Sequence, residues 1–336
     1  MSRATASAGR RTGHLVSVVL LAVVAAGLGA CGSSSPGAQT KGDTVPVQAA
    51  VARPRPKLPV TVTDADGHDV VVTDVSRIVT LWTNISEVVY SLGLGDDIVG
   101  RDVSTTFPPL DRLPAVTRGH DLSAEALLSL KPTLVLADDE SGPPEALDQV
   151  RAAGIPVVTF ARASSVAEIA QDIRAVARAV GLAGEGTRLA AHTQAEVRKV
   201  QRAIPAGRKP KVAFLYMRGN AGVYLIGGKG SGADSMIDAA GGVDAGTAMG
   251  LDAPFTPITS EALVQAAPDI ILMTTSGLAS VGGMEGLLKV PGVAQTPAAA
   301  SRQVVTEDDG VLYSFGSRTP EALRTLIADF HPKDGS

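Results

Sequence analysis

Hydrophobic positions in the first half of the chain follow two periods, one typical of strands and one typical of helices. Short apolar runs of three to five residues alternate with longer segments that carry apolar residues three and four positions apart. The runs predict strands at 77–81, 98–100, 133–137 and 157–160, and the longer segments predict helices at 84–92, 123–130 and 144–153. Such alternation favours a largely parallel sheet. Ahead of it, 60–63 and 70–73 form a predicted hairpin with an Asp66-Gly67 turn.

A long helical pattern then covers residues 165–204. Apolar residues recur at helical spacing through the whole segment, and only the glycines between 181 and 186 interrupt it. We therefore predict a long helix with a break or kink near those glycines. The alternation resumes beyond it, with strands predicted at 212–216, 224–226, 270–273 and 304–306 and helices at 233–240, 260–267 and 320–330.

An internal repeat relates the two halves. The segment Glu125–Leu136 matches Glu261–Leu272: in both, a glutamate opens a helix, a proline follows seven residues later, and a buried strand comes next. One copy precedes the long helix and the other follows it. The repeat predicts two similar α/β lobes joined by a helical spine, and the alternative is a chance similarity of two helix–proline–strand units. We expect the lobes at 59–163 and 207–332, and the linking helix at 164–206.

The N-terminal region has the composition of an export signal. Arginines precede an apolar stretch from Leu15 to Ala30, and the stretch ends in Leu-Gly-Ala-Cys31. This ending resembles a bacterial lipobox, in which the cysteine is diacylated and becomes the mature N-terminus. We therefore predict a signal peptide at 1–30, and a lipid on Cys31 (palmitate among its acyl chains) with a flexible tether at 31–58. The alternative is an ordinary secretory signal followed by a stray cysteine.

Composition narrows the classes of function. Cys31 is the one cysteine in the chain, so the mature domain offers no disulfide and no other thiolate. Aromatic residues make up 3%, the net charge is −4, and basic residues form no stripe, which argues against nucleic-acid binding. The glycine-rich stretch 228–232 has neither P-loop nor dinucleotide-binding spacing, and the sequence contains no Gly-x-Ser-x-Gly elbow. We expect a monomeric protein that is not an enzyme.

Several stretches carry a resemblance to a known family. The chain resembles class III substrate-binding proteins of ABC importers in four places: the Asp-Gly hairpin, residues 87–100, residues 122–132 and the single long helix. The resemblance implies two Rossmann-like lobes joined by a backbone helix, with the ligand in the cleft between them. Within that class, 123–136, 142–150 and 228–242 are similar to haemin-binding lipoproteins. The implied ligand is ferric haem b, and the implied partners are a permease and its ATPase at the outer face of the cell membrane of a Gram-positive, high-GC bacterium.

The resemblance also suggests which residues bind. Haem iron in proteins is held by His, Met, Tyr or Cys. His120 lies on a predicted loop where the family places a ligand from the first lobe, and its alternative role is that of a solvated loop histidine. Tyr216 and Arg218 match the Tyr-x-Arg pattern of the second lobe. Residues two apart on a strand share a face, so Arg218 can reach the Tyr216 oxygen. The alternative for Tyr216 is a strand-end tyrosine whose ring is in the core.

Two glutamates have a separate role by resemblance. Glu125 and Glu261 match residues at the outer tips of the two lobes that pair with arginines of the permease. A simpler explanation is that an acidic residue in the first turn complements the helix dipole. A siderophore or cobalamin binder of the same fold is the closest rival function, and a zinc or manganese binder is a second one.

Overall fold

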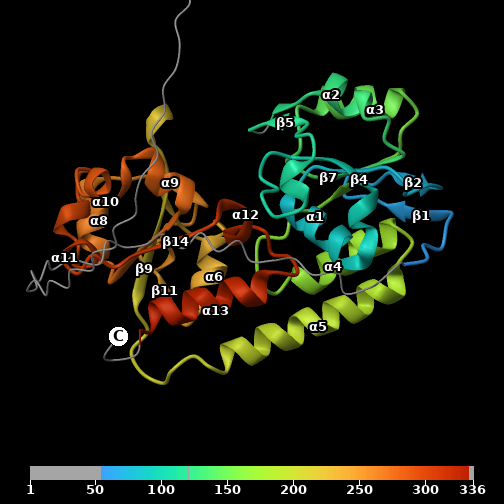
Figure 1. The fold of residues 1–336 in the computed structure, drawn as a ribbon. Coiled ribbons are helices and arrows are strands. Elements are labelled where there is room, and N and C mark those ends of the chain that lie inside the picture. The colour runs from blue at the N-terminus through green and yellow to red at the C-terminus, as the bar shows by residue number, and fades with distance from the viewer. Residues whose placement is uncertain (1–53, 120, 333–336) are drawn as a thin grey trace, which may run out of the picture. The chain divides into compact units, whose positions relative to one another are not determined.

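Two α/β lobes follow each other along the chain (Figure 1). The structure is a computed structural model, and it describes residues 54–119 and 121–332. The predicted signal peptide, Cys31, most of the tether and His120 therefore lie outside the described residues. Within the described part of the chain, no helix is long and apolar enough to cross a membrane.

The N-terminal lobe is built on a parallel sheet of four strands, in the order β4-β3-β7-β8. The strands are β3 (Ile78–Thr80), β4 (Ile98–Arg101), β7 (Leu134–Asp138) and β8 (Val157–Phe160). Two hairpins flank the sheet: β1 (Val60–Thr63) with β2 (Asp69–Val72), and β5 (Thr117–Arg118) with β6 (Asp121–Leu122). Strands β7 and β8 are buried along their whole length and are apolar except for Asp138 and Thr159, because helices cover both faces of a parallel sheet.

Helices cover the two faces of this sheet. They are α1 (Thr83–Val89), α2 (Ala124–Ser129) and α3 (Pro144–Ala152). Leu134 and Leu136 of β7 belong to the cluster that contains α1, while Val135 and Ala137 belong to the cluster that contains α2 and α3. The period of two along β7 therefore divides its side chains between the two faces.

The C-terminal lobe is built on a mixed sheet in the order β12-β10-β9-β13-β14, with β11 paired to the start of β9. Its strands are β9 (Lys211–Arg218), β10 (Val223–Gly227), β11 (Val243–Asp244), β12 (Phe255–Pro257), β13 (Ile270–Thr274) and β14 (Val304–Glu307). Its helices are α6 (Ala233–Ala239), α7 (Ala245–Ala248), α8 (Ser260–Ala266), α9 (Thr275–Ser280), α10 (Gly283–Leu287), α11 (Pro297–Ala300), α12 (Asp309–Leu312) and α13 (Thr319–Phe330). Strands β10 and β12 run antiparallel to their neighbours, so the second sheet is only partly parallel.

The predicted linking segment contains two helices, α4 (Ile169–Ala179) and α5 (Ala183–Gln201). The break occurs at Gly181, which has a φ of 72°, a backbone conformation that favours glycine. The two helices pack against each other, and a Cβ on Gly186 would collide with Ala177. Only α5 leads onward to the second lobe, and α13 packs along it (Figure 1).

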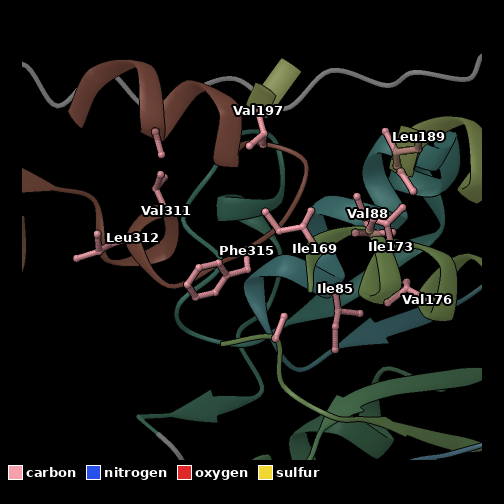
Figure 2. Packing of buried hydrophobic residues seen from close by; sticks show 14 of the residues in the cluster. Ile85, Val88, Ile169, Ile173, Val176, Leu189, Val197, Val311, Leu312 and Phe315 are labelled. Carbon is pink, nitrogen blue, oxygen red and sulfur yellow. The ribbon is translucent and has the colours of Figure 1, made fainter. Parts of the chain in front are cut away.

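One hydrophobic core continues from the first lobe into the second. It contains buried residues of α1, α4 and α5 together with residues of the C-terminal lobe such as Val311, Leu312 and Phe315 (Figure 2). A buried ion pair accompanies this apolar contact: the Glu87 carboxylate of α1 lies 2.6 Å from the Arg318 guanidinium. The lobes are therefore held together by packing and by charge, and not by α5 alone.

The internal repeat has the same structure in both lobes. Ser123 caps α2 and Thr259 caps α8, each by accepting a hydrogen bond from a backbone N–H of the first turn. Both helices are followed by a non-glycine residue in the left-handed region, Lys131 (φ 48°) and Ala267 (φ 42°). A proline and a buried parallel strand follow in each case. The two units are thus structurally equivalent, as the sequence predicted.

Candidate functional site

A cleft of about 680 Å³ lies between the two lobes. Trp82, Gly119 and Arg162 line it from the first lobe, and Tyr216 and Tyr313 are among the residues that line it from the second. Its volume is within the range of about 300–1,000 Å³ that small-molecule sites occupy. A larger hollow of about 880 Å³ is formed by β1, β8 and the start of α5. We place the site in the cleft because the larger hollow contains none of the predicted ligand residues.

Strand β9 brings Tyr216 and Arg218 into the cleft together. The strand runs to Arg218, two residues beyond the predicted end, because β10 pairs with it as far as Val223 opposite Arg218. Tyr216 is therefore within the strand, and Arg218 points to the same face. Met217 between them is fully buried in the cluster on the opposite face. The predicted pair is thus brought together by strand geometry.

The Arg218 guanidinium lies over the tyrosine ring and not at its oxygen. Its carbon is 4.9 Å from the centroid of the Tyr216 ring. Its N–H groups donate to Ser276 Oγ at 2.7 Å and to Asp309 Oδ1 at 3.1 Å. Ser276 Oγ in turn donates to Asp309 Oδ1 at 2.6 Å, so three side chains from β9, α9 and α12 fix one another. The arrangement holds the guanidinium over the Tyr216 ring in a cation–π contact.

Other aromatic rings line or adjoin the cleft on the second-lobe side, and one of them contacts Tyr216. The Phe255 ring centroid is 5.6 Å from that of Tyr216, and Phe214 lies 5.8 Å from Tyr313 in an edge-on arrangement. The Tyr313 hydroxyl is buried and has no hydrogen-bond partner among the described residues. Burial raises the pKa of Tyr313 well above 10, Tyr216 and Asp309 act in the same direction, and Arg218 opposes them. Tyr313 therefore remains a neutral phenol in the wall of the cleft.

The first-lobe side carries a stack that the sequence did not suggest. The Arg162 guanidinium lies 3.8 Å from the centroid of the Trp82 ring. It also forms ion pairs with Asp138, at 2.5 Å, and with Glu140, at 2.7 Å. Arg162 follows β8 by two residues, and the carboxyl ends of parallel strands are where ligands usually bind. The position of Arg162 after β8 could have marked it as a cleft residue from the sequence alone. Its contacts with Trp82, Asp138 and Glu140 could not be predicted, because these residues are far from Arg162 in the sequence.

His120 cannot be placed, because it lies outside the described residues. Its neighbour Gly119 lines the cleft and has a φ of 60°. Strands β5 and β6 pair on either side of this position, with Arg118 opposite Asp121. The chain therefore lines the cleft at Gly119, immediately before His120, and the role of His120 as a ligand stays a prediction.

The two glutamates of the internal repeat occupy equivalent surface positions. Glu125 lies in the first turn of α2 and Glu261 in the first turn of α8, and both are exposed. Such positions suit an acid that complements a helix N-terminus, and they also leave both carboxylates accessible to a partner.

A cluster of possible metal ligands lies in the β1–β2 hairpin. Side-chain atoms of Asp64, Asp66 and His68 lie within 4.8 Å of one another. Asp64 Oδ1 accepts a hydrogen bond from the His68 backbone N–H at 2.8 Å, which fixes the turn. Since this bond ties the cluster to the hairpin itself, we assign it a structural role.

Comparisons with known proteins agree on one family. A model described as periplasmic binding protein matches residues 78–310. An uncharacterized ABC transporter substrate-binding lipoprotein of Bacillus subtilis strain 168, YvrC, is 27% identical over 279 residues, which cover 82% of this chain and 86% of that protein. A vitamin B12-binding protein of Photorhabdus laumondii is 28% identical over 140 residues, which cover 41% of this chain and 50% of that protein.

Solved structures give a more extensive match. The crystal structure of the haem-binding protein HmuT superposes with a TM-score of 0.82 at 41% identity, covering 87% of this chain and 96% of that chain. Solved structures of the same protein include three variants, in which a histidine, a tyrosine and an arginine are each replaced by alanine. The replaced tyrosine and arginine are two positions apart and follow the histidine in the chain.

Proposed function

This chain belongs to the periplasmic binding protein family, and from that premise we propose that it binds ferric haem in the interlobe cleft and delivers it to an ABC permease. The chain has the class III fold that the sequence predicted. Its family and its structural neighbours are binding proteins that serve transport, not enzymes.

The observation that carries the proposal is the position of Tyr216. A tyrosine is an established haem-iron ligand, and a phenolate is a hard anionic donor suited to ferric iron. Tyr216 lies in a cleft of sufficient size, with the Arg218 cation 4.9 Å from its ring. Asp309 and Ser276 keep Arg218 in that place.

The second iron ligand in this proposal is His120. The adjacent Gly119 lines the cleft from the first lobe, and Tyr216 lines it from the second. The His, Tyr and Arg variants of HmuT follow the same order and the same Tyr-x-Arg spacing as His120, Tyr216 and Arg218 in this chain. These observations support axial coordination from both lobes.

Cobalamin is the second candidate ligand, because vitamin B12-binding proteins are among the relatives. That relative matches 41% of this chain, whereas the haem-binding HmuT covers 87% at higher identity. The Tyr216–Arg218 pair also suits an iron centre that lacks its own axial ligand. We therefore favour haem over cobalamin and over a ferric siderophore.

The proposed cellular location rests on the sequence and on the relatives. We propose that Cys31 carries the lipid after removal of residues 1–30, and that the domain works at the outer face of the cell membrane of a Gram-positive, high-GC bacterium. The YvrC relative is named a lipoprotein, which supports this. Glu125 and Glu261, exposed on equivalent helices, would contact the permease from the two lobes.

Competition between ligands tests the proposal. The full chain, purified in detergent, is titrated with haemin and separately with cyanocobalamin, and quenching of Trp82 fluorescence is followed. Trp82 is the one tryptophan of the chain and it lines the cleft, so its quenching reports on the proposed site. We expect saturable quenching by haemin that cyanocobalamin does not displace. Saturable binding of cyanocobalamin without haemin binding would overturn the proposal.

A further inference from the structure

Arg162 is held by two carboxylates of different character. Its Nε donates to Asp138 Oδ2 at 2.7 Å, and its Nη1 lies 2.7 Å from Glu140 Oε2. The Asp138 side chain is 3% exposed and also accepts a hydrogen bond from Ser141 at 2.6 Å. The Glu140 side chain is 61% exposed. Asp138 is therefore a permanent anchor, while the contact with Glu140 is one that solvent or a ligand can replace.

The aromatic stack leaves Arg162 well placed for a ligand. The Trp82 ring supports one face of the guanidinium, at 3.8 Å from its centroid, and both side chains line the cleft. A guanidinium that is fixed on one side by Asp138 and stacked on Trp82 has little freedom left to lose on binding. Its Nη1, which now contacts Glu140, is the group that can donate to a new partner.

The other charged side chains that line the cleft already have hydrogen-bond or ion-pair partners within the protein. Among the described residues that line it, Arg218 is the second cation, and it is engaged by Asp309 and Ser276. Asp102 accepts hydrogen bonds from the Ser104 backbone N–H at 2.9 Å and from Thr105 Oγ1 at 2.8 Å. A ligand that brings its own carboxylate therefore finds its readiest partner in Arg162.

We propose that Glu140 stands in for a carboxylate of the ligand, and that a haem propionate displaces it from Arg162 during binding. The proposal rests on the proposed haem function and adds to it a specificity device. A propionate carries the same carboxylate group and charge as the Glu140 side chain, and an arginine binds a carboxylate through directed, charge-assisted hydrogen bonds. A ligand whose side chains are amides or esters lacks the charge to displace Glu140. The site would thus select for free carboxylates on the macrocycle.

The test compares haemin with haemin dimethyl ester, which keeps the iron and loses both carboxylate charges. Each is titrated into the wild-type chain and into Glu140→Gln, with Glu145→Gln, an exposed acid on α3, as the matched control. An exposed ion pair is worth roughly 0.2–1 kcal/mol, so removing the competing charge should raise haemin affinity by about 1.4- to 5-fold. The ester should bind more weakly than haemin and should not respond to the substitution.

The possible results distinguish a failure of the displacement proposal from a failure of the proposed haem binding. If the wild-type chain binds haemin but Glu140→Gln leaves haemin affinity unchanged, or changes the affinity for haemin and the ester equally, the displacement idea is wrong and the haem function stands. If the wild-type chain binds neither compound, the haem function itself fails. The Arg162→Gln variant adds a check: it should reduce the preference for haemin over the ester, and an unchanged preference would also overturn the proposal.

Discussion

Replacing Asp172 with asparagine should remove a pH dependence of stability that burial of its carboxyl group creates. Asp172 lies on α4, is 7% exposed, and accepts a hydrogen bond from Asn84 Nδ2 of α1 at 2.8 Å. Burial raises its pKa from 3.8 to about 7, and the nearby carboxylates Asp138 and Glu168 add to the effect. The carboxyl group is therefore largely protonated in the folded protein at a pH where it is ionised in the unfolded chain.

This difference in pKa between the folded and unfolded states makes the free energy of unfolding depend on pH. Because the folded state binds the proton more tightly than the unfolded state, the stabilisation is fully present below the unfolded pKa, near 4. It is lost progressively as the pH rises through the interval up to the folded pKa of about 7. An interval of about three pH units at about 1.36 kcal/mol each corresponds to a loss on the order of 4 kcal/mol. Above that interval the loss remains constant.

Urea unfolding from pH 4.5 to pH 8 measures this loss. Asparagine has nearly the same shape, can still accept from Asn84, and cannot ionise, so the variant should be more stable than the wild type above pH 7, by a margin that narrows steadily as the pH falls toward 4.5. Burial also raises the pKa of Asp238, Asp244 and Glu307. These groups are common to both proteins, so the difference between the two curves isolates Asp172. Parallel curves would refute the reasoning, and Asp148→Asn, an exposed acid, serves as the control.

Two further predictions concern the residues between the lobes. Glu87→Ala leaves the buried Arg318 guanidinium without its carboxylate and should lower the free energy of unfolding by about 3–5 kcal/mol, measured in urea; a loss below 1 kcal/mol would mean that the pair does not hold the lobes together. Tyr313→Phe removes a buried hydroxyl that lacks a hydrogen-bond partner among the described residues, so stability should change by less than about 1 kcal/mol and the haemin spectrum should be retained. A shifted haemin spectrum in Tyr313→Phe would instead identify this phenol as an iron ligand.

Much of the fold could be predicted because its signals are local. Strands β7 and β8 are short apolar runs, and the break between α4 and α5 occurs at Gly181, within the glycines that interrupt the helical pattern. The two-residue strands β5 and β6 were not predicted, since pairs this short leave no periodic pattern. The end of β9 was placed too early because its last residues are strand only through their pairing with β10.

Only part of the site could be predicted from the sequence, because only some of its contacts join residues that are close in the chain. Tyr216 and Arg218 are two positions apart, so the strand period alone predicts a shared face. The stack of Arg162 on Trp82 and the ion pair of Arg218 with Asp309 join residues that are far apart in the chain. Such partners are set by the packing of separate elements, and a single sequence contains no pattern for them.

The absorption spectrum of the haemin complex tests the central claim most directly. Wild type, Tyr216→Phe and the control Tyr224→Phe, a tyrosine on the adjacent strand that is 37% exposed, are each saturated with ferric haemin and their Soret maxima compared. If Tyr216 binds the iron, the spectrum of Tyr216→Phe differs from that of the wild type, and that of Tyr224→Phe does not. Identical spectra for all three proteins would contradict iron coordination by Tyr216.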